Sequence, residues 1–215
     1  MNDNYIHKGK RKRLAESLMQ KGITDQKVLD AIKIVPRHLF IEPIFEHHAY
    51  DDKPFSIGEG QTISHPYTVA FQTQLLNIKP EDKILEIGTG SGYQASILYQ
   101  LSKNIFSIEQ SKMLFQKTKK LLSSVFNYKM NLFFGDGSIG LKKHAPFDKI
   151  IVTAGAPIMN ESLKKQLKIG GILVIPVGDS KSQKMIRVTK EEGELYNYET
   201  FSDFSFVPLV GEHGW

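Results

Sequence analysis

Short apolar segments alternate with segments of helix length from Lys83 onward, and this alternation constrains the fold more than any other feature of the sequence. Five segments have the length and apolar character of buried strands, at 83–87, 104–108, 130–134, 147–153 and 171–177. Strands that alternate with helices pair in parallel, because each helix carries the chain back across one face of the sheet. The pattern therefore predicts a doubly wound α/β fold.

Two further segments, 185–189 and 195–201, alternate between apolar and polar positions around a turn-like run at 191–194. They predict an antiparallel hairpin at the C-terminal end of the sheet. With the five segments above, they bring the expected sheet to seven strands, most of them parallel.

Two amphipathic helices are expected ahead of this core. Leu14, Leu18 and Met19 form the apolar stripe of the first helix. Thr24 can cap the second, which must end near Pro36 because the residue before a proline avoids the helical region. Residues 36–66 are expected to be mostly loop.

The composition removes several classes of protein. The chain has no cysteine, so disulfides and thiolate ligands are excluded, and no apolar run approaches the roughly 20 residues of a membrane span. A cytoplasmic location without a membrane partner is expected. Five basic residues between positions 8 and 13 carry much of the formal charge of +5, and a solvated helix start explains them better than a nucleic-acid partner does.

The run LEIGTGSGY at residues 85–93 follows an expected strand and opens an expected helix. Its alternate glycines, Gly88, Gly90 and Gly92, let the backbone pass close to a ligand. A dinucleotide fingerprint needs glycine at position 93 as well, but Tyr93 stands there. A nicotinamide cofactor is therefore disfavoured.

Acidic residues stand at or just after the ends of three successive expected strands. Glu86 can face the ammonium group of S-adenosylmethionine, a cofactor without phosphate. Glu109 lies where acidic residues reach ribose hydroxyls in doubly wound folds, and Asp136 with Gly137 can form the adenine end. Taken singly, such residues often only cap helices or serve turns. Their coincidence at one edge of the sheet favours S-adenosylmethionine as the cofactor.

The block GQTISHPYTVA at residues 60–70 resembles the substrate loop of protein-L-isoaspartate O-methyltransferases, which are class I S-adenosylmethionine-dependent enzymes with a Rossmann-like fold. VPRHLF at 35–40, TAGAP at 153–157 and FVPLVG at 206–211 are similar to blocks of the same family in the same order. The resemblance covers nearly the whole chain. His65 departs from it, since bacterial relatives often have glutamine there.

The resemblance implies a carboxyl methyltransferase that acts on the free carboxylate of L-isoaspartyl residues in damaged proteins and peptides. It implies that Ser64 is the catalytic residue, although the same side chain could cap a helix that begins at Pro66. It also places four further residues around the substrate peptide, Gln61, Thr62, Ile63 and Val210.

Methyl transfer to a carboxylate requires few catalytic groups. A carboxylate with a pKa near ~4 is already ionised at neutral pH, so the acceptor oxygen needs no general base. Positioning and the exclusion of water are expected to dominate. No metal is expected either, because His47 and His48 are adjacent and the other histidines lack the spacing of metal ligands.

Two alternatives stay open at this point. One is a class I methyltransferase that acts on an RNA base, and the other is a non-catalytic relative that binds nucleic acid through the basic N-terminus. We expect a monomer with a single methyltransferase domain over residues 1–215. Within it, 1–80 form the N-terminal helices and substrate loop, 81–178 the cofactor-binding core, and 179–215 the hairpin and C-terminal substrate segment.

Overall fold

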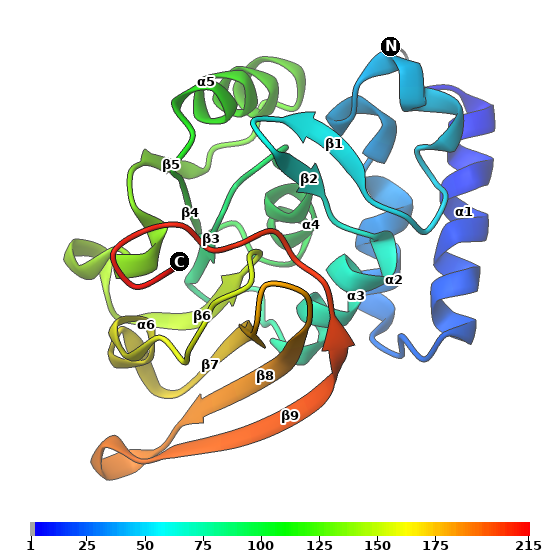
Figure 1. The fold of residues 1–215 in the computed structure, drawn as a ribbon. Coiled ribbons are helices and arrows are strands. Elements are labelled where there is room, and N and C mark those ends of the chain that lie inside the picture. Colours follow the sequence, from blue (N-terminus) through cyan, green and yellow to red (C-terminus); the bar gives the residue numbers. More distant parts are fainter. Residues whose placement is uncertain (1–2) are drawn as a thin grey trace.

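A seven-stranded sheet forms the centre of the computed structural model, which describes residues 3–215 (Figure 1). The strand order is β5–β4–β3–β6–β7–β8–β9. Pairing is parallel from β5 to β7 and antiparallel at β7–β8 and β8–β9. The predicted sheet, mostly parallel with a closing hairpin, is confirmed. Its strands are β3 (Ile84–Ile87), β4 (Ile105–Glu109), β5 (Asn131–Phe134), β6 (Phe147–Val152), β7 (Leu167–Gly178), β8 (Gln183–Lys190) and β9 (Tyr196–Phe204).

Helices cover both faces of the sheet, which is why β3 and β4 are buried along their whole length. One apolar layer joins Ile84 and Ile105 to helices α3 (Pro66–Leu75) and α4 (Tyr93–Leu101). The opposite layer joins Leu85 to α6 (Glu161–Lys165). Helix α5 (Lys112–Lys120) follows β4 and continues into the π turn η3 (Leu121–Val125).

The N-terminal helices are α1 (Tyr5–Gln20) and α2 (Gln26–Ile34). Leu14 and Leu18 are buried as expected, but Met19 is 53% exposed because it lies on the outer side of the helix. Asp25, rather than Thr24, caps α2, and its carboxylate accepts the Lys27 N–H at 2.9 Å. The N-cap of α2 is therefore the carboxylate of Asp25, one residue after the expected Thr24.

Residues 36–66 contain more regular structure than the expected loop. The 3-10 helices η1 (Arg37–Phe40) and η2 (Pro43–His48) precede a hairpin of β1 (Phe55–Gly58) and β2 (Gln61–Ile63). Glu59 and Gly60 both have positive φ, as tight hairpin turns require. The prediction was wrong here because strands of four and three residues are too short to show a periodic pattern. Shorter 3-10 turns occur at η4 (Gly137–Ile139), η5 (Lys142–His144) and η6 (Glu192–Glu194).

A segment close to the C-terminus, residues 207–212, forms what we call the C-terminal strap. In Figure 1 the red chain leaves the end of β9, crosses the ends of the central strands and turns back toward the C-terminus. None of the helices within residues 3–215 combines the length and apolarity needed to cross a membrane.

Candidate active site

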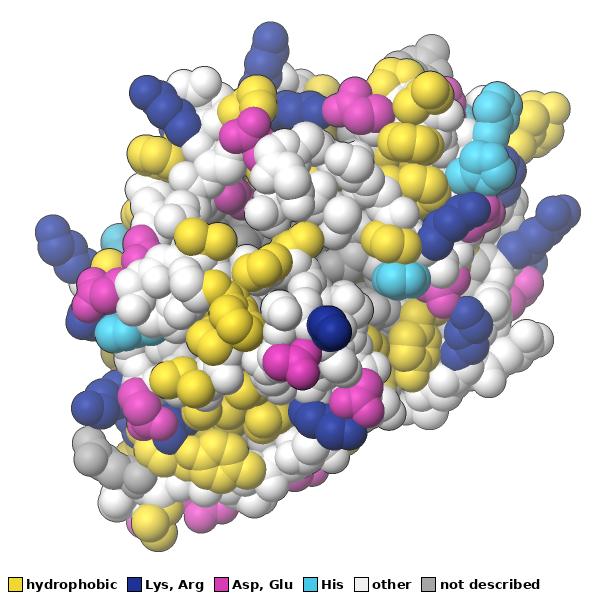
Figure 2. Space-filling model, in the orientation of Figure 1, with side chains coloured by type: hydrophobic (Ala, Val, Ile, Leu, Met, Phe, Trp, Pro, Cys, Tyr) yellow, Lys and Arg dark blue, Asp and Glu magenta, His cyan; other side chains and the backbone are white. Residues whose placement is uncertain are grey.

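A cavity lies at the edge where β3, β4 and β6 end. Parallel α/β sheets bind ligands at this edge, because the loops that follow the strands diverge there. Four segments supply most of its wall, at 61–64, 87–91, 108–111 and 207–210. In the orientation of Figure 1, hydrophobic side chains gather near the centre of the face and most Lys and Arg side chains project around its outline (Figure 2).

The glycine loop joins β3 to α4 and forms the floor of the cavity. Gly88 has a φ of 92°, and a Cβ built there would lie 2.5 Å from the Thr153 hydroxyl oxygen. That hydroxyl donates to the Gly88 carbonyl at 2.7 Å, so only glycine fits this contact. Gly90 also lines the cavity, whereas Gly92 lies behind it and packs against Thr118.

Glu109 ends β4 and lies in the cavity wall. One carboxylate oxygen accepts the Gly90 N–H and the other accepts the Ser111 N–H, each at 2.8 Å. These bonds fix the carboxylate between the glycine loop and the start of α5. Its remaining lone pairs can accept hydrogen bonds from a ligand.

Glu86 lies behind the cavity wall rather than in it, which differs from the expected place beside a ligand. Its side chain is fully buried in β3, where one oxygen accepts the Ser107 hydroxyl at 2.5 Å and the other has no hydrogen-bond partner among residues 3–215. Ser107 in turn bonds to the Thr89 hydroxyl at 2.6 Å. Burial raises the pKa of Glu86 to about 8, so the neutral acid prevails at pH 7.

Glu86→Gln is expected to remove a pH dependence of stability. Because the folded pKa of about 8 lies above the unfolded value of 4.5, the folded state holds this proton more tightly, and stability is lost as pH rises between those values. Denaturant unfolding at pH 5 and pH 8 should show wild type losing on the order of 3 kcal/mol more than the variant, at about 1.4 kcal/mol per pKa unit. Equal losses in both proteins would show that Glu86 is ionised when buried.

Asp136 and Gly137 both follow β5, but only Gly137 lines the cavity. Gly137 lines the cavity, and a Cβ there would lie 2.7 Å from a methyl carbon of Ile87. The Asp136 carboxylate is absent from the wall and accepts the N–H groups of Ser138 and Glu212, both at 2.8 Å. Although partial burial opposes it, the Glu212 and Ser138 hydrogen bonds hold the pKa of Asp136 below its ordinary value.

The expected substrate residues Gln61, Thr62, Ile63 and Ser64 all lie in the cavity wall, on the β1–β2 hairpin and just after it. Buried Ile63 anchors the hairpin to the core. The Ser64 hydroxyl has no hydrogen-bond partner within residues 3–215, and α3 begins at Pro66 without a side-chain cap. Capping, the alternative role for Ser64, is therefore not observed.

The C-terminal strap closes the cavity from the other side. The Gly155 N–H donates to the Val207 carbonyl and the Leu209 N–H donates to the Gly155 carbonyl, each at 2.8 Å. The backbone N–H and carbonyl of Val210 have no partner within the described part of the chain. They are free to pair with a bound peptide.

Several wall residues were missed from the sequence. Tyr93 and Gln94 lie in the wall and are buried, and the Tyr93 hydroxyl and the Gln94 amide oxygen have no hydrogen-bond partner in the described part of the chain. The sequence signal that could have identified them is their position directly after the glycine loop. Glu59 and Gln72 come from the hairpin turn and α3, and only the folded chain brings them to the cavity.

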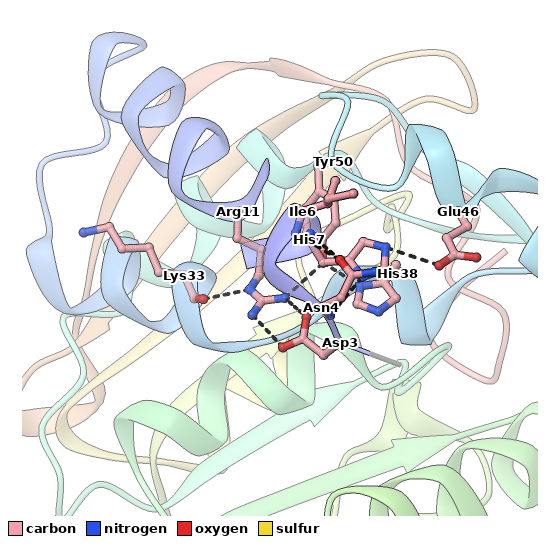
Figure 3. Close-up of polar contacts among 9 residues, drawn as sticks. All are labelled: Asp3, Asn4, Ile6, His7, Arg11, Lys33, His38, Glu46 and Tyr50. Atoms are coloured by element: carbon pink, nitrogen blue, oxygen red, sulfur yellow. Dashed lines mark hydrogen bonds and ion pairs between the residues drawn. The ribbon is translucent and has the colours of Figure 1, made fainter. Parts of the chain in front are cut away.

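Asp3, His7 and His38 form a polar cluster on the N-terminal side of the molecule, away from the cavity wall (Figure 3). They are the one group within residues 3–215 that comes close enough to hold a metal ion. Both Asp3 oxygens accept from Arg11, at 2.6 and 2.9 Å. The two imidazole rings stack at 3.8 Å with an interplanar angle of 20°. The nitrogen lone pairs of two nearly parallel stacked rings do not point at one ion. The positive charge of Arg11, which is bonded to Asp3, also repels a cation.

His38 completes this cluster as a buried neutral ring. One nitrogen is 2.6 Å from the Tyr50 hydroxyl, and the other has no hydrogen-bond partner within residues 3–215. Burial and the neighbouring His7 lower the pKa of His38 to about 4. The cluster thus supports packing of α1 on η1, and the absence of a metal stays a prediction.

The sheet order and a cavity lined by a glycine loop and a strand-end glutamate define the class of S-adenosylmethionine-dependent methyltransferases. The family model of protein-L-isoaspartate(D-aspartate) O-methyltransferase matches residues 9–214. The chain belongs to this family, as the resemblance in its sequence predicted.

Relatives and solved structures agree with that assignment. A protein-L-isoaspartate O-methyltransferase of Cytophaga hutchinsonii is 56% identical over 100% of this chain and 97% of its own length. That of Flavobacterium johnsoniae is 51% identical over 98% of each chain. A Plasmodium falciparum protein described as this enzyme, in complex with S-adenosyl-L-homocysteine, has a TM-score of 0.81 at 26% identity, covering 93% of this chain and 98% of the other.

Proposed function

We propose how this cavity performs the reaction of its family. The chain methylates L-isoaspartyl residues with S-adenosylmethionine, which begins the repair of damaged proteins. The observation that carries the proposal is the place of Ser64 in the same cavity wall as the glycine loop and Glu109, with a hydroxyl that has no hydrogen-bond partner within residues 3–215. The alternatives of an RNA methyltransferase and of a non-catalytic nucleic-acid binder are set aside.

The charge of the cavity wall suits this cofactor. Among residues 3–215, Glu59 and Glu109 are the charged residues that line it, and neither Lys nor Arg does. S-adenosylmethionine carries an ammonium and a sulfonium, so an acidic wall without phosphate-binding cations fits it. When bound, it supplies a methyl group on a positively charged sulfur. Glu109 would accept from the ribose hydroxyls, and Gly88, Gly90 and Gly137 would leave room for the ligand along the wall.

Glu86, Gly92 and Asp136 act indirectly in this proposal, because none of them lines the cavity. Glu86 supports the glycine loop through Ser107 and Thr89. Gly92 allows the left-handed start of α4, with a φ of 86°. The sequence assigned these residues to the cofactor directly, and their placement favours a supporting role.

Ser64 orients the acceptor. The substrate carboxylate is already ionised at neutral pH, so no residue has to remove a proton from it. The Ser64 hydroxyl donates a hydrogen bond to one carboxylate oxygen, which leaves the other oxygen directed at the methyl group. Such preorganised donors hold a reacting group in line without reorganising during the reaction.

Backbone groups hold the substrate peptide. Gln61, Thr62, Ile63 and Val210 all line the cavity. The unpaired N–H and carbonyl of Val210 offer main-chain hydrogen bonds, which do not depend on the neighbouring side chains of the substrate. This mode suits an enzyme that recognises a rerouted backbone in many sequences.

The basic N-terminus does not have to bind nucleic acid. Arg11 is buried and donates to Asp3 and to the Lys33 carbonyl, and Lys10 donates to the His47 carbonyl. Part of the positive charge thus stabilises the N-terminal helices. We further propose that the chain acts as a single-domain monomer in the cytoplasm.

The activity is tested with a matched pair of peptides that differ only in carrying L-isoaspartate or normal aspartate. The purified protein is incubated with methyl-labelled S-adenosylmethionine, and volatile methanol is counted after base treatment. Base-labile label is expected on the isoaspartyl peptide alone. Equal label on both peptides, or none while the cofactor still binds, would refute the proposed substrate.

A further inference from the structure

Helix α3 begins two residues after Ser64, and its first turn lacks a local acceptor. His65 precedes the helix, and its side chain accepts no N–H from the first turn, which begins at Pro66. Hydrogen bonding to the helix backbone starts with the Val69 N–H, which donates to the His65 carbonyl at 3.1 Å. The N–H of Tyr67, one turn earlier, therefore needs an acceptor from another part of the chain.

Asp52 supplies this acceptor from 15 residues upstream. One oxygen of its carboxylate accepts the Tyr67 N–H at 2.9 Å, and the other accepts the Lys21 ammonium at 2.6 Å. The negative charge also lies at the positive end of the helix dipole, where a carboxylate is stabilising. Asp52 itself does not line the cavity. It thus takes the part of a helix cap without belonging to the cavity wall.

Arg37 holds the segment that carries Asp52. The Arg37 side chain is fully buried, and it donates to the Ala49 carbonyl at 2.9 Å and to the Lys53 carbonyl at 3.2 Å. These two carbonyls lie on either side of Asp52 in the sequence. The guanidinium also lies over the ring of Tyr93, 4.9 Å from its centroid, and Tyr93 lines the cavity. The position of the Asp52 segment is therefore fixed relative to the cavity wall.

Ser64 is the residue that would otherwise accept the Tyr67 N–H. It lies three residues before Tyr67, the spacing at which a serine hydroxyl caps the first turn of a helix. The hydroxyl instead has no partner within residues 3–215, and Ser64 lies in the cavity wall. We propose that Asp52 is a positioning residue that occupies the Tyr67 N–H and so keeps the Ser64 hydroxyl available for the substrate carboxylate. The inference rests on the proposed function, because it assigns Ser64 to the substrate.

Two substitutions of Asp52 separate the acceptor from the charge. Asp52→Ala leaves the Tyr67 N–H to the Ser64 hydroxyl, so kcat for an isoaspartyl peptide should fall about tenfold, within the range of one helix cap. The Kd of S-adenosylhomocysteine should stay within about twofold, because Asp52 does not line the cavity. Asp52→Asn retains an acceptor oxygen, and asparagine caps helices as well as aspartate does, so its kcat should stay within about twofold of wild type. The ion pair with Lys21 that this variant loses is partly exposed and contributes little.

A double variant tests whether Asp52 acts through Ser64. If it does, Asp52→Ala should cause no further loss of kcat in a protein that already carries Ser64→Ala, since the two effects then share one group. Asp51→Ala is the matched control, because Asp51 is the preceding residue and its exposed carboxylate pairs with His48 and Lys53. This variant should have the kcat of wild type.

Initial rates at saturating peptide and cofactor give kcat, calorimetric titration gives the Kd of S-adenosylhomocysteine, and thermal unfolding confirms that each variant folds. Hydrogen exchange of the Tyr67 amide in the wild-type protein adds a test that needs no variant, and slow exchange is expected. A loss of kcat in Asp52→Ala that is absent from Asp52→Asn and from the Ser64→Ala background supports the inference.

Four results would overturn it. These are wild-type kcat in a folded Asp52→Ala, an equal loss in Asp52→Asn, a loss that multiplies that of Ser64→Ala, and exchange of the Tyr67 amide at the rate of an unfolded chain. Wild-type kcat in Ser64→Ala, or failure of the wild-type enzyme to methylate the isoaspartyl peptide, would instead refute the proposed function on which the inference rests.

Discussion

Replacing Ser64 by alanine is expected to lower kcat for an isoaspartyl peptide by about 100-fold, the size found when one preorganised donor to a reacting oxygen is removed. The Ser64 hydroxyl lies in the cavity wall and has no other partner within residues 3–215, so its removal leaves no broken bond in the fold. Initial rates with saturating cofactor and peptide measure the effect. The Kd of S-adenosylhomocysteine should stay the same.

Ser56→Ala is the matched control for this experiment. Ser56 lies on β1 of the same hairpin but is exposed and outside the cavity wall. Its variant should retain wild-type kcat. Equal rates for Ser64→Ala and wild type would remove Ser64 from the mechanism, whereas equal losses in both variants would point to damage of the hairpin.

Replacing Glu109 by alanine is expected to raise the Kd of S-adenosylhomocysteine about 100-fold. The change removes an acceptor from the wall and also frees the Gly90 and Ser111 N–H groups that its carboxylate holds at 2.8 Å. Hydrogen bonds to charged groups contribute about 1.5–3 kcal/mol each, and about 1.4 kcal/mol corresponds to a tenfold change in Kd. Calorimetric titration of the folded variant measures the loss.

Glu191→Ala serves as the comparison for Glu109→Ala. Glu191 is an exposed glutamate between β8 and β9, outside the cavity wall, so its loss should not change the Kd. If both variants bind S-adenosylhomocysteine as wild type does, Glu109 is not a cofactor residue and the proposed orientation of the ligand is wrong.

The sheet was predictable because its signals are local. The segments from Lys83 onward have the length and apolarity of buried strands, and seven strands form as expected. The β1–β2 hairpin was not predictable in the same way. It is stabilised by burial of Phe55, Ile57 and Ile63 against the N-terminal helices, which involves contacts between distant parts of the chain.

The sequence predicted which residues belong to the candidate site, but it did not predict which of their side chains line the cavity. Glu109 and Ser64 lie in the cavity wall as expected, since the end of a strand and a loop next to a helix fix their positions. Glu86 lies within β3 and Asp136 follows β5, but neither residue lines the cavity. Sequence position does not show which way a side chain points, and here Ser107 and Glu212, which lie 21 and 76 residues further along, decide it.

The most direct test of the central claim is a crystal structure of the protein with S-adenosylhomocysteine and an isoaspartyl peptide. The measured quantity is the distance from the Ser64 hydroxyl oxygen to the isoaspartyl carboxylate. We predict a hydrogen bond of about 2.7 Å, with the second carboxylate oxygen directed at the cofactor sulfur. A carboxylate bound beyond hydrogen-bond reach of Ser64, with that hydroxyl still unpartnered, would contradict the mechanism.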